Sequence, residues 1–80
     1  MSVEAKDLVK KIRGQIARRY IDSSMVNISV VGGTVYLTGV LHKLRTAPDV
    51  DLKAEMEQIG KILRTVPGVR DVIWDVTQRT

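Results

Sequence analysis

The 80-residue chain is long enough for one small domain, and 44% of its residues are hydrophobic, as in ordinary globular proteins. It contains no cysteine, which excludes disulfides, thiolate nucleophiles and cysteine-bound zinc. Its formal net charge of +4 favours anionic partners such as nucleic acid or acidic lipid, although the same charge would also serve solubility alone.

The amino-terminal residues carry charges of both signs and lack the apolar segment of a secretory signal peptide. No apolar run approaches the about 20 residues that span a bilayer. From these two observations we expect either a cytoplasmic protein or a mature piece cut from a longer precursor.

The first predicted element is an amphipathic helix from Val3 to about Tyr20. Its apolar residues recur at the spacing of one helix face and are Ala5, Leu8, Val9, Ile12, Ile16 and Tyr20. The run Asp22-Ser23-Ser24 predicts that the helix has ended there and that the chain turns.

Two strand-like runs follow, from Met25 to Val31 and from Thr34 to Leu41. Gly32-Gly33 separates them, and a tight turn of type I′ or II′ needs the positive φ that glycine tolerates. The pattern therefore predicts an antiparallel hairpin. In its second strand one face would carry Val35, Leu37 and Gly39, and the other would carry Tyr36, Thr38 and Val40.

A polar connection from His42 to Asp51 leads to a second predicted helix, from Leu52 to Val66, which Asp49 or Asp51 can cap. Pro67-Gly68 ends that helix. A third strand, from Val69 to Thr77, follows from the alternation of its apolar residues.

These elements predict an α+β fold of αββαβ order, with two helices packed on one face of a three-stranded mixed sheet. The third strand is expected beside the second and parallel to it, through a right-handed connection. With no phenylalanine and one tryptophan, the core must consist mainly of branched aliphatic side chains. The chain, residues 1–80, is expected to form a single domain.

Two motifs in this chain resemble those of the BON domain family, which has a G-x-V-x-L-x-G hairpin and a V-P-G-V-x-x-V junction. They are Gly33-Thr34-Val35-Tyr36-Leu37-Thr38-Gly39-Val40 and Val66-Pro67-Gly68-Val69-Arg70-Asp71-Val72. The resemblance covers roughly residues 5–78. It implies the αββαβ fold, a non-enzymatic module that attaches to phospholipid surfaces or to other envelope components, and a location in the bacterial periplasm or envelope.

Nothing in the sequence predicts a catalytic site, a metal site or a cofactor. His42 is the only histidine and has no cysteine or serine motif beside it, so we expect it to be a solvated loop residue. Capping and the helix dipole explain Asp49 and Asp51. Gly32-Gly33 matches neither a P-loop nor a dinucleotide-binding motif.

Basic residues are the best binding candidates. Lys6, Lys10 and Arg13 form a ridge on one flank of the first helix, and Lys43 with Arg45 forms a second group in the connection. Each Lys or Arg near an anionic bilayer contributes about 1 kcal/mol, so a ridge of three binds weakly without a second contact or an oligomer. The alternative is that the ridge is simply a solvated helix face.

The expected partner is an anionic phospholipid surface or another protein. Weak self-association is predicted through Tyr36, Val40 and Ile73 on the open sheet face, or through the edge of the first strand, unless nearby threonines and Asp75 keep the face wet. Two alternatives are a homo-oligomerising structural domain and a module for single-stranded nucleic acid. The latter lacks a G-x-x-G clamp and has one aromatic residue on the open face.

Overall fold

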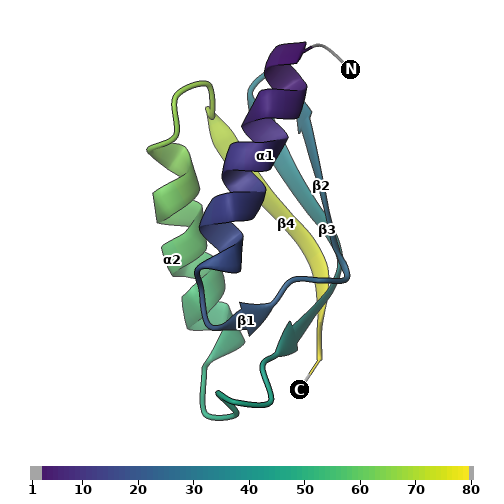
Figure 1. The fold of residues 1–80 in the computed structure, drawn as a ribbon, viewed down its shortest axis with the longest axis vertical. Coiled ribbons are helices and arrows are strands. Elements are labelled where there is room, and N and C mark those ends of the chain that lie inside the picture. The colour runs from purple at the N-terminus through teal and green to yellow at the C-terminus, as the bar shows by residue number, and fades with distance from the viewer. Residues whose placement is uncertain (1–2, 80) are drawn as a thin grey trace.

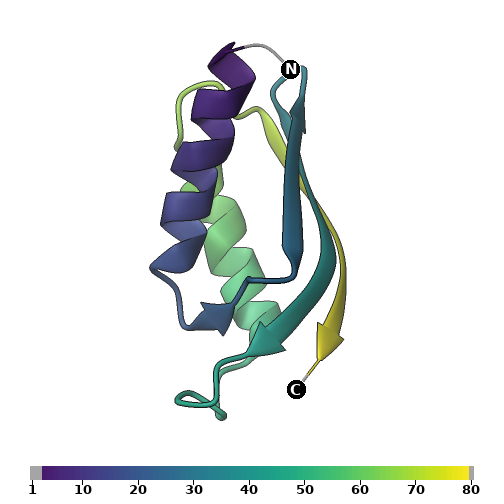
Figure 2. The same ribbon diagram turned by 45° about the vertical axis from the view of Figure 1, so that its right-hand side comes forward.

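The computed structural model describes residues 3–79, which form two helices and a sheet (Figure 1). In chain order the elements are α1 (Val3–Ala17), β1 (Ile21–Asp22), β2 (Val26–Val31), β3 (Thr34–Lys43), α2 (Leu52–Arg64) and β4 (Asp71–Arg79). Both helices cover the same face of the sheet, as Figure 2 shows, and leave the other face open. The predicted α+β class and the one-sided packing of the helices are therefore confirmed.

Strand β3 lies at the centre of the sheet. β2 pairs with it antiparallel, from Val26 opposite Gly39 to Val31 opposite Thr34. β4 pairs with it parallel along the other edge, as far as Arg79 opposite His42. The sheet is therefore mixed, and its last strand lies beside and parallel to β3, as predicted.

The sheet contains one short strand more than predicted. In β1, Ile21 lies opposite Lys43 and Asp22 lies opposite His42, which continues the side of β3 that β2 occupies. Between the two paired segments, residues 23–25 face residues 40–41, so the outer strand carries one extra residue, as in a β-bulge. The turn predicted at Asp22-Ser23-Ser24 therefore begins only after Asp22. His42, which was predicted to be a loop residue, lies in strand β3.

Most element boundaries also differ by one to three residues from the predictions, and β2, β3 and β4 run from Val26 to Val31, from Thr34 to Lys43 and from Asp71 to Arg79. α1 ends at Ala17 because the chain must reach β1, and Tyr20 is 64% exposed instead of belonging to the buried helix face. α2 ends at Arg64 rather than Val66, and β4 begins at Asp71. The predicted cap of α2 is confirmed, since the Asp51 carboxylate accepts hydrogen bonds from the backbone amides of Lys53 and Ala54 at 3.0 and 3.4 Å.

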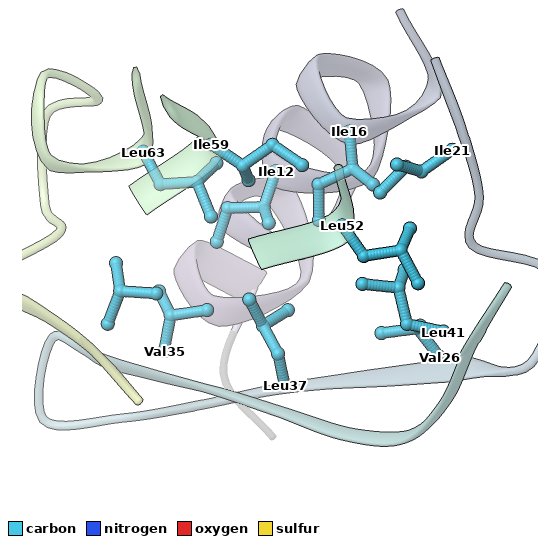
Figure 3. Close-up of a cluster of buried hydrophobic side chains, with 11 residues drawn as sticks. Ile12, Ile16, Ile21, Val26, Val35, Leu37, Leu41, Leu52, Ile59 and Leu63 are labelled. Carbon is cyan, nitrogen blue, oxygen red and sulfur yellow. The ribbon is translucent and has the colours of Figure 1, made fainter. Parts of the chain in front are cut away.

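The core between the helices and the sheet consists of aliphatic side chains (Figure 3). The helices contribute Ile12, Ile16, Leu52, Ile59 and Leu63, and the strands contribute Ile21, Val26, Val35, Leu37, Leu41 and Val72. Trp74 is partly buried against this cluster. It lies beside Gly60 of α2, where an added Cβ would be 3.9 Å from the indole nitrogen.

The turn between β2 and β3 has the positive φ angles that the sequence predicts, 57° at Gly32 and 83° at Gly33. The Gly33 carbonyl accepts a hydrogen bond of 2.8 Å from the backbone amide of Arg70. A Cβ at Gly33 would lie 2.9 Å from the Arg70 side chain and 3.1 Å from the Gly68 carbonyl. The two sequence motifs, which are far apart in the chain, therefore contact each other at one end of the sheet.

Candidate functional site

The ridge of Lys6, Lys10 and Arg13 lies on the exposed side of α1. Its orientation is fixed by Ile12 and Ile16, which are 0% and 1% exposed and anchor the opposite side of the helix in the core. Residues three and four apart share a helix face, so the three cations lie in one row. The structure thus brings these three predicted residues together.

Two further cations extend this row to a broad basic face. Lys11 lies on α1 and Arg18 on the turn after it, and both are exposed. We call the five residues Lys6, Lys10, Lys11, Arg13 and Arg18 the basic face. Among the α1 side chains that the structure describes, Asp7 is the one carboxylate. Among the side chains of residues 6–79, no ion pair involves any of the five.

A groove of about 440 Å³ runs beside this face, between α1 and the turn that follows α2. Lys10, Lys11 and Arg18 line it on the α1 side, together with Gly14 and Gln15. Thr65, Val66 and Pro67 line the opposite side. None of the lining residues carries a carboxylate, so the groove is electrically suited to an anion.

The second predicted basic group lies elsewhere. The connection from β3 to α2 is at the end of the molecule opposite the start of α1 (Figure 1). There the Lys43 ammonium donates a hydrogen bond of 3.3 Å to the Pro48 carbonyl, and Arg45 is exposed. A hollow of about 360 Å³ at Lys43 is also lined by Asp49 and Asp51, which offset its charge. The structure therefore does not join Lys43 and Arg45 to the ridge.

The family model for the BON domain matches residues 5–48, which are more than half of the chain. The chain belongs to the BON domain family. The matched residues hold α1 from residue 5 onward, β1, β2 and β3, and so include the Gly33–Val40 motif. Comparisons with curated proteins and with solved structures give no match.

BON domains are small non-catalytic binding modules, and nothing in the described part of this one indicates an enzyme. Among the side chains of residues 6–79, no group of three His, Asp or Glu residues could hold a metal ion, and no polar or charged side chain is buried. His42 is half-buried on β3, between Asp22 and Arg79 in the strand register. Over the same residues, no helix is long and apolar enough to cross a membrane.

One ion pair of this BON domain was not predicted. The Arg19 guanidinium donates two hydrogen bonds to the Glu55 carboxylate, Nε to Oε2 at 2.9 Å and Nη2 to Oε1 at 3.0 Å. The hydrogen bond to Glu55 raises the pKa of Arg19. The pair fastens the turn after α1 to the first turn of α2, so Arg19 serves the fold and is separate from the basic face. The two residues are 36 positions apart, and no sequence pattern marks them as partners.

The open face of the BON sheet carries the predicted interface residues. Tyr36 and Ile73, which are 36% and 41% exposed, lie side by side in the β3–β4 register. Val40 is half-buried and lies opposite Thr77. The row between them pairs Thr38 with Asp75, so Val40 is separated from the other two by polar side chains.

Proposed function

We propose that this BON domain attaches to an anionic phospholipid surface through its basic face. The observation that supports the proposal is the charge imbalance of α1 and the turn after it, where five exposed cations stand against two carboxylates, those of Glu4 and Asp7. Because no ion pair among the side chains of residues 6–79 involves these cations, binding to lipid phosphates breaks no pair among those residues.

The other helix does not offer such a surface. On α2, Lys53 and Lys61 are accompanied by Glu57, and Arg64 lies 3.7 Å from the Asp71 carboxylate. Long-range attraction to a negative surface depends on the local excess of charge. We therefore expect α1, and not α2, to face the membrane.

The expected affinity of one domain is low. Against the two carboxylates of α1, the five cations have three positive charges in excess. Each contributes about 1 kcal/mol near an anionic bilayer, so the total is about 3 kcal/mol. That free energy corresponds to a dissociation constant of about 6 mM. Stable attachment then requires several copies, because a second domain held nearby binds as an intramolecular step.

Co-sedimentation with phosphatidylcholine vesicles, with and without phosphatidylserine, tests the proposal at low and high salt. We expect binding only to the anionic vesicles and only at low salt, because the contacts are exposed charges. The triple variant Lys6→Gln, Lys10→Gln and Arg13→Gln should bind at least about tenfold less.

The matched control removes three other exposed cations, through Lys53→Gln, Lys61→Gln and Arg45→Gln. It lowers the net charge equally but leaves the basic face intact, so its vesicle binding should stay close to that of the unmodified chain. Equal losses in the two triple variants would contradict the proposal, because net charge alone would then explain binding. Absence of binding to anionic vesicles at low salt would also contradict it.

The exposed pair of Tyr36 and Ile73 favours a second candidate, weak self-association through the open sheet face. Stacking two open faces would bury both residues and place two basic faces in one particle. Sedimentation velocity over a wide concentration range tests this, and Tyr36→Lys should abolish any dimer. A monomer at all concentrations would rule it out.

The nucleic-acid alternative has less support. Recognition of single strands usually stacks several bases on aromatic side chains. On the described sheet Tyr36 is exposed, whereas Trp74 packs toward the core. A labelled oligonucleotide that binds tightly in a salt-sensitive manner would reverse this ranking.

A further inference from the structure

The groove beside the basic face has a feature that the packing of the domain does not require. Gly14 lies inside α1, where glycine costs up to about 1 kcal/mol relative to alanine. Its φ is not positive, and an added Cβ would meet no atom within 4 Å. Neither backbone conformation nor a close neighbour therefore explains a glycine at this position.

Because Gly14 has no side chain, it makes the groove beside α1 deeper. Lys10 and Arg18 are four residues before and after it, and Lys11 is three residues before it, so all three are its neighbours on the helix surface. Without a side chain at the centre, these three cations surround a bare patch of helix. That patch is the α1 side of the groove.

The opposite wall is held in place and offers little polarity. The backbone amides of Thr65 and Val66 donate to the carbonyls of Ile62 and Leu63, each at 3.1 Å. The Thr65 hydroxyl also donates to the Ile62 carbonyl, at 2.6 Å. Since these donors are already engaged, the wall presents mainly the apolar surfaces of Val66 and Pro67 to the groove.

This arrangement defines the ligand by its chemistry. Three cations and the Gln15 amide offer hydrogen-bond donors on one side, and no carboxylate lines the groove. A phosphate monoester carries a charge of about −1.5 to −2 at neutral pH and three acceptor oxygens, more than a carboxylate carries. An arginine binds two such oxygens at once, and lysines add point charges. The apolar wall fits the uncharged part of an ester.

We propose that the groove between α1 and residues 65–67 binds the phosphate group of an organic phosphate monoester. Arg18, Lys10 and Lys11 hold the phosphate over Gly14, and the rest of the ester lies against Val66 and Pro67. The monoester is either a lipid headgroup, as in phosphatidic acid, or a soluble compound. For the lipid source the inference rests on the proposed function; for a soluble source it stands alone.

The first experiment is a titration of the whole chain with glycerol 3-phosphate, followed by amide chemical shifts in nuclear magnetic resonance spectra. We expect saturable shifts at Gly14, Gln15 and Val66, and at least about tenfold weaker binding of acetate, since acetate has less charge to bring to three cations. Shifts that are uniform over the surface, or equal for acetate, would overturn the inference.

The variant Gly14→Leu places a side chain in the groove without removing a charge. The site is open, so the variant should fold, which its thermal unfolding checks. It should weaken glycerol 3-phosphate binding at least about tenfold, as should the double variant Lys11→Gln and Arg18→Gln. The control, Lys53→Gln with Lys61→Gln, removes two exposed charges of α2 that lie outside both the groove and the basic face, and it should leave binding within about twofold.

Vesicles containing either phosphatidic acid or phosphatidylserine then identify the source. A preference for phosphatidic acid that Gly14→Leu abolishes supports a lipid ligand. Saturable binding of glycerol 3-phosphate without vesicle binding supports a soluble ligand and contradicts the proposed function. Normal vesicle binding without a saturable phosphate site contradicts phosphate binding in the groove but agrees with the proposed function.

Discussion

Gly39 in the central strand and Gly14 on the helix surface are glycines under opposite constraints. Gly39 has a φ of 105° and lies against the Met25 carbonyl, closer than any side chain would permit. Gly14 has ordinary helical geometry and open space around it. Close packing in the sheet thus requires a glycine at position 39. No such packing constrains the residues around Gly14, which are therefore available for binding.

The largest effect is expected where the constraint is strongest. Gly39→Ala should destabilise the domain by about 3 kcal/mol or more, because it combines a strained φ with a clash against backbone. Denaturant unfolding followed by circular dichroism measures the loss. Gly32→Ala is the matched control, since its φ is also positive at 57° but no atom lies within 4 Å of the added Cβ. It should cost only about 1–2 kcal/mol, and equal costs would remove the role of Met25.

The next largest effect concerns the ion pair between Arg19, which lies beside the basic face, and Glu55 of α2. Glu55→Gln should destabilise the domain by about 1–2 kcal/mol, because it breaks a half-buried, two-bonded pair with Arg19. Arg13→Gln, which removes an exposed cation, should change stability by less than about 0.5 kcal/mol. A double-mutant cycle with Arg19→Gln isolates the coupling, and a coupling near zero would contradict the structure.

Replacement at the open helix position should stabilise the domain. Gly14→Ala should raise the free energy of unfolding by about 0.5–1 kcal/mol, because alanine favours the helix and meets no neighbour. Thermal and denaturant unfolding check the gain. A loss of stability would show that the backbone at Gly14 is constrained after all, and the contrast with Gly39 would fail.

The smallest effect lies beside the bulge and depends on pH. Hydrogen bonds from Ser24, first from its side chain and then from its backbone amide, lower the pKa of Asp22. A carboxyl with a lower pKa in the folded state stabilises above its unfolded pKa of about 3.9 and loses that contribution as pH falls through the folded pKa. Asp22→Asn should therefore cost about a few tenths of a kcal/mol at neutral pH, and less in acid. An equal difference at both pH values would contradict this.

Local patterns account for most of what the sequence predicts correctly. Alternation along β2 and β3 and the two glycines at their turn identify the hairpin, and the stripe from Leu52 to Leu63 identifies α2. These signals depend on neighbouring residues alone. The ridge of the basic face was predictable for the same reason, because helical spacing places its members together.

The features that were missed depend on contacts between distant segments. β1 is two residues long and exists because the end of β3 pairs with it. Arg19 meets Glu55 only after both helices have packed. The groove likewise needs the turn at Thr65 to lie beside Gly14, and no periodicity in either segment indicates that arrangement.

The central position of β3 also has a kinetic consequence. Its partner β2 is joined to it by a two-residue turn, whereas β4 reaches it only after residues 44–70 have folded over the sheet. Hairpins form in about 1–10 μs, but non-local pairings must first overcome the entropy of closing a long loop. We expect docking of β4 to limit the folding rate. Substitutions at Gly39, within the early hairpin, should then slow folding, whereas substitutions at the far end of β4 should mainly accelerate unfolding.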